Sequence, residues 1–266
     1  MQDKLNDKEI KKRVFETLQH VKYVCEENHI PYSLCFGTLL GAKRHGGFIP
    51  WDDDVDVCVL RSDYERLLSL LKDQHGRFKL MSMATNRDYY YNFAKMVDTE
   101  TTVVEHGYKP IQGYGVYVDI FPLDYAPSDE KRFRRLVSQI NRISAMKTLS
   151  IMASAEFVAG KKKIAYYVLS PFAKLIGYRH WRNTCEKKMR SQNKGEYVCC
   201  LTEKPKYREL MKASDMQNLT TITFEGEEFA CFSNNEEYLK NRYGDYMKLP
   251  PVEQRVSHHD FEAFLK

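Results

Sequence analysis

The residues best suited to chemistry in this chain of 266 residues are four aspartates at positions 52, 53, 54 and 56. Valines occupy every second position from 55 to 59, a pattern that predicts a strand over 54–60. Residues two apart on a strand face the same way, so Asp54 and Asp56 are expected to share one face. Two close carboxylates repel each other unless a cation lies between them. Oxygen ligands suit Mg²⁺ or Mn²⁺, so we predict a metal site here; an exposed acidic turn is the alternative.

A third carboxylate is expected from another strand. Residues 116–121 are otherwise apolar, and Asp119 lies among them, where a buried charge needs a partner. We therefore predict that Asp119 joins Asp54 and Asp56 as a metal ligand and catalytic residue, with Asp124 as a reserve. The alternative is an aspartate that is paired within the core and has a structural role only.

A phosphate-binding turn is predicted upstream of the aspartates. Gly37 and Thr38 stand between an expected strand at 32–36 and an expected helix at 39–44. A turn of this kind offers backbone N–H groups and a hydroxyl to a phosphate. Because an isolated Gly-Thr pair is common, the prediction depends on the aspartates that follow it.

Several basic side chains are candidates for phosphate contacts. Lys43, Arg44 and His45 follow the Gly-Thr pair, although they are equally compatible with a solvated helix end. Lys95 stands in an apolar strand expected at 90–97, where an ammonium group needs an anionic partner. We favour a substrate phosphate as that partner.

Four further residues are predicted to contact substrate. Trp51 can stack on a base or cover a quaternary ammonium group, and core packing is its alternative role. Asp52 and Asp53 can hold the loop or bind a cationic substrate group. His258, in the tail, is predicted to fold back over the site, and a surface position is its alternative.

The remaining periodicity predicts helices and strands around these residues. Apolar residues at helical spacing predict a helix over 9–28, and Ser62 followed by Glu65 has the capping-box pattern. Other elements are expected at 62–74, 78–83, 221–232 (a hairpin) and 236–243. We divide the chain into a catalytic core (1–127), a basic helical subdomain (128–195) and a C-terminal part that completes the core (196–266).

Composition limits the classes of protein that fit. The net charge of +5 is too small for a dedicated nucleic-acid binder, and 43% hydrophobic residues support a sizeable core. Seven cysteines without framework spacing predict reduced thiols and a cytoplasmic location. We expect neither a signal peptide nor a transmembrane span. Mixed basic and apolar residues at 165–169 and 172–176 predict an interfacial helix in peripheral contact with a membrane.

Three motifs together resemble the signature of the LicD family. They are FGTLLGAKRHGGFIPWDDDVD at 36–56, VDIFPLD at 118–124, and YLKNRYGD at 238–245 with Pro250. The resemblance implies an α+β nucleotidyltransferase-type fold, in which a mixed sheet is flanked by helices, here with a helical insertion. It also implies metal ligands at Asp54, Asp56 and Asp119 and a phosphate-side role for Gly37 and Thr38.

The same resemblance implies the reaction. Family members are phosphotransferases that use CDP-alcohols, so we expect Mg²⁺-dependent transfer of phosphocholine from CDP-choline to a lipid-linked glycan such as teichoic acid or lipopolysaccharide. The place of action would be the inner face of the cell membrane. The alternatives are transfer of ribitol phosphate or glycerol phosphate, a nucleotidyltransferase reaction, and a catalytically inactive binding domain of the same fold.

Overall fold

A computed structural model describes residues 3–74, 76–157, 160, 162–192, 194–256 and 261–266. His258 lies outside the described residues. None of the helices formed by this part of the chain has both the length and the apolar character needed to cross a membrane.

The centre of the molecule is a mixed sheet. Its strands follow the order β1-β2-β6-β4-β3. In addition, β7 pairs with the C-terminal end of β6, and β8 pairs with β7. The β2–β6 pair is parallel, whereas the other pairs of this sheet are antiparallel. The strands are β1 (Ser33–Leu34), β2 (Asp56–Leu60), β3 (Phe78–Met81), β4 (Ala94–Asp98), β6 (Tyr117–Ala126), β7 (Tyr197–Cys199) and β8 (Met211–Lys212).

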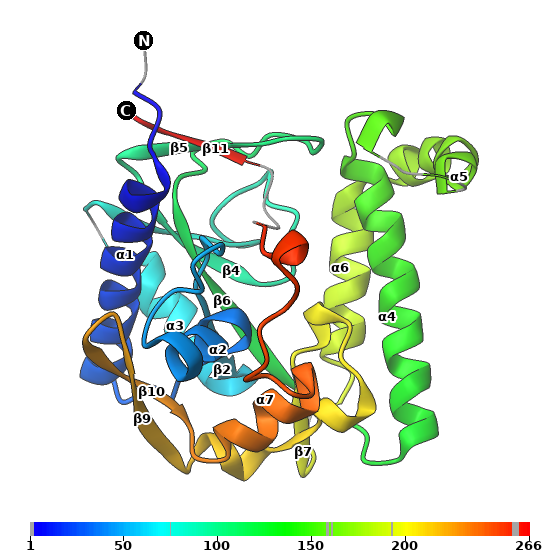
Figure 1. The fold of residues 1–266 in the computed structure, drawn as a ribbon. Coiled ribbons are helices and arrows are strands. Elements are labelled where there is room, and N and C mark those ends of the chain that lie inside the picture. Colours follow the sequence, from blue (N-terminus) through cyan, green and yellow to red (C-terminus); the bar gives the residue numbers. More distant parts are fainter. Residues whose placement is uncertain (1–2, 75, 158–159, 161, 193, 257–260) are drawn as a thin grey trace.

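Helices pack around this sheet, as the sequence predicted for an α+β fold (Figure 1). The apolar face of α1 (Asp7–Glu27) is buried at Val14, Leu18 and Val21, and the N-terminus of the helix has a capping box. Both α1 and α3 (Arg61–Lys72) contact the sheet, whereas α2 (Phe36–His45) contacts β2 and α7 (Asn235–Tyr243).

A separate group of helices stands at one side of the sheet (Figure 1). Long helices α4 (Glu130–Ile151) and α6 (Tyr178–Met189) lie side by side, and α5 (Lys162–Ile176) lies across one of their ends. A second hydrophobic cluster, which includes Phe133, Ile140 and Cys185, joins α4 and α6. These helices fall within the segment predicted to be helical.

The C-terminal part adds two small sheets. Strands β9 (Leu219–Phe224) and β10 (Glu227–Phe232) form the predicted hairpin, and β11 (Phe261–Leu265) pairs with β5 (Thr101–Glu105). Short 3-10 helices complete the described chain at Ala155–Phe157, Leu201–Glu203, Tyr207–Glu209, Ala213–Met216 and Val252–Gln254.

Three local predictions were wrong. Ser62 does not cap α3, because β2 continues directly into the helix and Leu60 occupies the cap position without a side-chain hydrogen bond. Gly37 and Thr38 do not form a separate turn before the helix. Both residues lie within the first turn of α2, whose N-cap residue is Cys35. Strand β2 also begins at Asp56, so Asp54 belongs to the preceding loop.

Candidate active site

Three charged side chains lie in one row across neighbouring strands. Asp56 on β2 is in register with Asp119 on β6, and Asp119 is in register with Lys95 on β4. All three are buried, with 7%, 7% and 2% of Asp56, Asp119 and Lys95 exposed. Strand pairing therefore brings together residues that are far apart in the sequence.

The row opens into a cavity of about 390 Å³, which we call the carboxylate cavity. It brings together six of the predicted site residues: Gly37, Asp52, Asp54, Asp56, Lys95 and Asp119. The predicted cluster of carboxylates is therefore a feature of the fold.

Asp56 is buried and crowded by like charges. Burial raises the pKa of Asp56 well above its usual range, and the charges of Asp54 and Asp119 raise it further. Its backbone N–H donates a 2.7 Å hydrogen bond to Oγ1 of Thr38, which ties the start of β2 to α2. Thr38 thus positions Asp56 and is not among the residues that line the cavity.

Lys95 has a protein partner in place of the predicted phosphate. Its Nζ donates a 2.6 Å hydrogen bond to Oδ1 of Asp119, and the two groups form a buried ion pair. The need for an anionic partner was predicted correctly, and in this structure Asp119 meets it.

The carboxylates are chemically suited to a divalent cation, although their side chains are not arranged as a complete metal site. Within the described part of the chain, no three His, Cys, Asp or Glu side chains are arranged to hold a metal ion as they stand. Asp54, Asp56 and Asp119 nevertheless present only oxygen donors to one cavity, and a cation there would relieve the repulsion at Asp56.

A second cavity of about 720 Å³ adjoins the first. Gly37 and Asp52 line both cavities, whereas Arg44 and Trp51 line the second alone. The Arg44 guanidinium lies 6.0 Å from the Trp51 ring centroid. A side chain at Gly37 would place its Cβ 2.9 Å from Oδ2 of Asp52, so glycine allows the loop to approach α2 closely.

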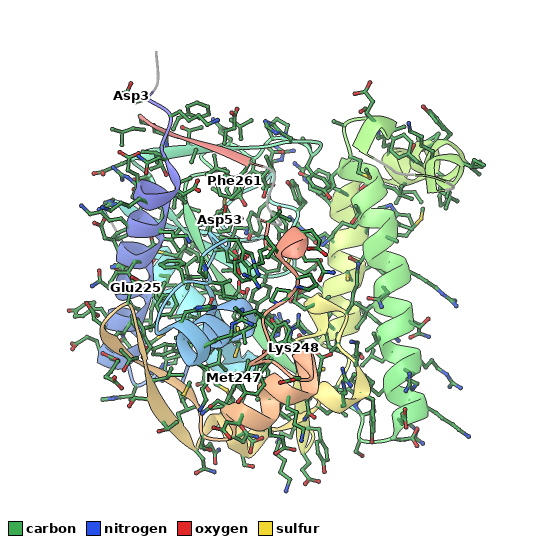
Figure 2. The ribbon with its side chains drawn as sticks, viewed as in Figure 1. Asp3, Asp53, Glu225, Met247, Lys248 and Phe261 are labelled. Atoms are coloured by element: carbon green, nitrogen blue, oxygen red, sulfur yellow. The ribbon has the colours of Figure 1, made fainter. Side chains whose placement is uncertain are left out.

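Besides Thr38, three predicted residues stand apart from both cavities. Lys43 forms an exposed 2.8 Å ion pair with Glu236. His45 packs edge-on against Trp51, with ring centroids 6.3 Å apart. Asp53 lies on the loop that leads into β2 and is not among the lining residues of either cavity (Figure 2). The reserve residue Asp124 is held elsewhere, in 2.7 Å hydrogen bonds from Arg61.

The sequence reasoning missed several lining residues of the carboxylate cavity. A run of aromatic residues at 89–93 supplies two of them, and its density was a signal that was available. No local sequence pattern indicated Glu203 as a site residue, because only the tertiary fold brings it to the cavity. The missed residues are Phe36, Tyr91, Phe93, Glu105, Tyr117, Phe121, Glu203, Arg242 and Tyr243.

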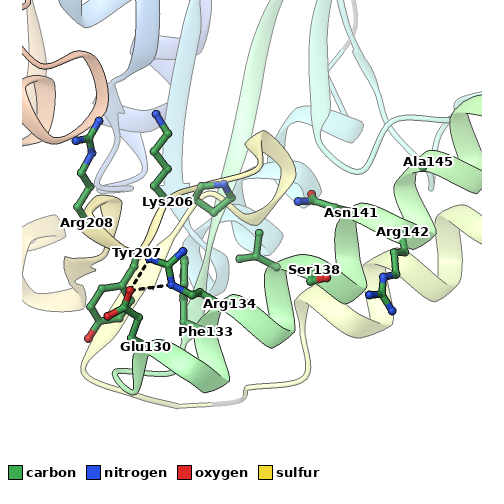
Figure 3. A pocket seen from close by; sticks show the side chains of 12 residues that line it. Glu130, Phe133, Arg134, Ser138, Asn141, Arg142, Ala145, Lys206, Tyr207 and Arg208 are labelled. Carbon is green, nitrogen blue, oxygen red and sulfur yellow. Dashed lines mark hydrogen bonds and ion pairs between the residues drawn. The ribbon is translucent and has the colours of Figure 1, made fainter. Parts of the chain in front are cut away.

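A larger cavity of about 850 Å³ lies outside this site, between α4 and residues 205–208 (Figure 3). Its lining includes Arg142, Lys206 and Arg208, together with Glu130, which is ion-paired to Arg134. Because none of Asp54, Asp56 and Asp119 lines it, we place the chemistry in the smaller carboxylate cavity.

Residues 29–147 match the model of a family described as LicD/FKTN/FKRP, nucleotidyltransferase domain. This segment is similar to the nucleotidyltransferase domain of that family, and the resemblance seen in the sequence is confirmed. It contains Asp54, Asp56, Lys95 and Asp119.

Two kinds of relative make the comparison more specific. The chain is 29% identical over 257 residues to the lipopolysaccharide cholinephosphotransferase LicD of Haemophilus influenzae, a match that covers 93% of this chain and 94% of that protein. It is 48% identical over 48 residues to the ribitol 5-phosphate transferase FKRP of Mus musculus and of Homo sapiens. The latter matches cover 18% of this chain and 10% of each relative.

Proposed function

We propose that this protein is a phosphotransferase that moves phosphocholine from CDP-choline to a sugar hydroxyl of a lipid-linked cell-surface glycan, such as teichoic acid or lipopolysaccharide. The observation that carries the proposal is the convergence of Asp54, Asp56 and Asp119 on one cavity within a LicD-family domain. Similarity to a lipopolysaccharide cholinephosphotransferase along nearly the whole chain supports choline as the alcohol.

Asp54, Asp56 and Asp119 would hold Mg²⁺, or Mn²⁺, in the proposed enzyme. When bound, such an ion neutralises charge on the diphosphate of the donor. Carboxylate oxygens are the ligands that these ions prefer, and the crowding that raises the pKa of Asp56 favours a cation in this place.

The protein's own task is to position the substrates and balance their charges. The sugar oxygen forms a bond to the β-phosphorus as the bond from that phosphorus to the departing CMP breaks. The hydroxyl proton passes to a carboxylate, for which Asp119 is our candidate. Lys95 and Arg242 line the cavity, where Lys95 balances the charge of Asp119 and Arg242 is our candidate for contact with phosphate oxygens.

The adjoining cavity suits the nucleotide. Trp51 presents a ring on which a base can stack, and Arg44 lies near it. Gly37 lies between the two cavities in the first turn of α2, where helix N–H groups lack partners within the helix and attract phosphate. We therefore assign the cytidine to this cavity and the diphosphate to the boundary between the two.

A screen of donors tests the function. CDP-choline, CDP-ribitol and CDP-glycerol are each incubated with the protein, Mg²⁺ and a lipid-linked glycan, and CMP release and glycan labelling are measured. We expect the highest kcat/KM with CDP-choline, a loss of at least about a hundredfold in Asp56→Asn, and no loss in the exposed control Asp73→Asn. Pyrophosphate release from a nucleoside triphosphate, without CMP from any CDP-alcohol, would instead identify a nucleotidyltransferase.

Ribitol phosphate is the second candidate for the transferred group. The 48% identity to ribitol 5-phosphate transferase FKRP over 48 residues is the observation that favours it. Preferential CMP release from CDP-ribitol would select this alternative.

We further propose that the protein works in peripheral contact with the inner face of the cell membrane, through α5. Seven large apolar side chains of α5 are at least 36% exposed: Ile164, Tyr167, Val168, Leu169, Phe172, Leu175 and Ile176. No acidic residue occurs between Glu156 and Glu186, whereas this stretch contains six lysines and arginines. An exposed apolar helix with cationic surroundings suits an anionic lipid surface.

A further inference from the structure

The ammonium group of Lys95 is surrounded by aromatic rings. Its Nζ lies 3.5 Å from the ring centroid of Tyr117, 4.8 Å from Tyr91, 5.1 Å from Phe93 and 5.8 Å from Tyr114. Lys95 is only 2% exposed, so these contacts are desolvated and strong for their type. The rings therefore form a surface that accepts a cation.

Three of these four rings also line the carboxylate cavity. Tyr91, Phe93 and Tyr117 are among its lining residues, and Tyr91 and Phe93 are half-buried. We call these three residues the aromatic wall. The wall thus belongs both to the surroundings of Lys95 and to the space in which the donor would bind.

Glu105 holds Tyr91 of this wall in place and adds negative charge. Its carboxylate accepts hydrogen bonds from the hydroxyls of Tyr90, Tyr91 and Tyr114 at 2.9–3.0 Å. Glu105 also lines the carboxylate cavity. Three phenols directed at one carboxylate fix the orientation of the neighbouring rings.

Acidic side chains outnumber basic ones around the cavity. Six aspartates and glutamates and only two basic residues line it. A single divalent cation would leave the acidic excess in place, so the cavity suits a second positive group. A neutral polyol carries no charge to match this excess, and the ring faces of the wall offer no hydrogen-bond partners to its hydroxyls.

We propose that the aromatic wall, with Glu105, is the subsite for the quaternary ammonium group of the donor's alcohol, and that it selects choline over neutral alcohols. The inference rests on the proposed function, because it assigns a place to the group that is transferred. A trimethylammonium group has no N–H to donate and is recognised through aromatic faces and nearby carboxylates.

Matched donors test the subsite. The comparison is between CDP-choline and its dimethylbutyl analogue, in which a neutral tert-butyl group of the same shape replaces trimethylammonium. We expect the protein with Mg²⁺ to favour CDP-choline by at least about tenfold in kcat/KM. Tyr91→Leu should reduce this preference severalfold, whereas Tyr91→Phe, which keeps the ring, should retain it. Trp51→Leu, a ring of the adjoining cavity, is the control and should leave the preference unchanged.

Equilibrium binding measurements distinguish failure of the proposed subsite from failure of the proposed transfer reaction. Calorimetric Kd values for the two donors report on the subsite even without turnover, and circular dichroism verifies that each variant is folded. Equal Kd values and equal kcat/KM in the unsubstituted protein would overturn the subsite. A preserved preference in Kd without CMP release from any donor would overturn the transfer function and leave the subsite standing. If Tyr91→Leu weakened both donors equally, the wall would bind the base, and the proposal would fail.

Discussion

Lys95 and Asp119 form a buried ion pair, so removing the charge of Lys95 takes away the ammonium group that Asp119 contacts. We expect Lys95→Met to lower the free energy of unfolding by about 3–5 kcal/mol without metal, because the buried Asp119 carboxylate then loses this positive charge. Mg²⁺ should restore more stability to the variant than to the unsubstituted protein, because it no longer competes with the lysine. Urea unfolding with and without Mg²⁺ measures both effects, and equal stabilisation of the two proteins would contradict the shared site.

At the scale of single residues, the sequence predicted which residues form the site better than it predicted the contacts between them. The pattern of residues 54–60 identified Asp54 and Asp56, and the apolar neighbours of Asp119 indicated a buried charge that needs a partner. The pairing of Asp119 with Lys95 depends on the register between β4 and β6, which no local pattern specifies. Glu203 reaches the cavity from a distant segment for the same reason.

The contact between α2 and β2 joins two elements through one hydroxyl. We expect Thr38→Val to lower the free energy of unfolding by about 1–3 kcal/mol, because the N–H of Asp56 loses its acceptor, and to lower kcat more than it raises KM. Thr38→Ser keeps the hydroxyl and is the control. Donor turnover and urea unfolding are the measurements. A rise in KM alone would indicate direct substrate contact, as the sequence analysis predicted for Thr38.

Helix α5 carries the second prediction at the scale of an element. Replacing Val168 and Leu175, which are 67% and 85% exposed, with glutamate should weaken binding to anionic phospholipid vesicles by about tenfold. Tyr23→Glu, at a 60% exposed position on α1, is the control. Co-sedimentation measures binding. If the double variant and the control bound equally, the proposed role of α5 would be wrong.

Element types were predicted well and their ends less well. Long amphipathic periodicity indicated α1, and the turn at Glu225 and Gly226 indicated the hairpin. The starts of α2 and α3 were misplaced because strand and helix follow each other without a connecting turn. A cap motif such as the one at Ser62 states a local preference, and the packing of the whole sheet can override it.

At the scale of the whole molecule, Asp98 ties α1 to the sheet. Its carboxylate accepts a 2.6 Å hydrogen bond from Arg13 and a 2.7 Å hydrogen bond from Arg77. Burial raises the pKa of Asp98, but the hydrogen bonds from Arg77 and Arg13 outweigh it and hold the pKa below the usual 3.8. Stability from this group is therefore complete above that pH and is lost as the pH falls through the folded pKa.

Asp98→Asn tests this tie. The variant should lose about 2 kcal/mol of unfolding free energy at neutral pH, and the difference from the unsubstituted protein should shrink as the pH falls below 3.8. Urea unfolding between neutral and acidic pH measures it, with Asp73→Asn as the exposed control. A difference that did not change with pH would show that the ionised carboxylate is not the source of the stability.

The overall class of fold followed from the motifs, whereas the arrangement of its parts did not. The family signature implied a mixed sheet with helices around it, and alternating patterns indicated individual strands. The position of α4 and α6 beside the sheet depends on a second cluster around Phe133 and Cys185, whose members come from separate segments. Long-range packing of this kind leaves little trace in local sequence.

The pairing of β11 with β5 has a practical consequence for how the protein can be handled. The backbone N–H of Leu5 donates to the carbonyl of Ala263, and that of Leu265 donates to the carbonyl of Asp3, so the first and last described segments lie together at one corner. That corner is on the opposite side of the view from α5 (Figure 1). A fluorophore or affinity handle attached at either end would therefore stand away from α5 and leave its exposed apolar face open.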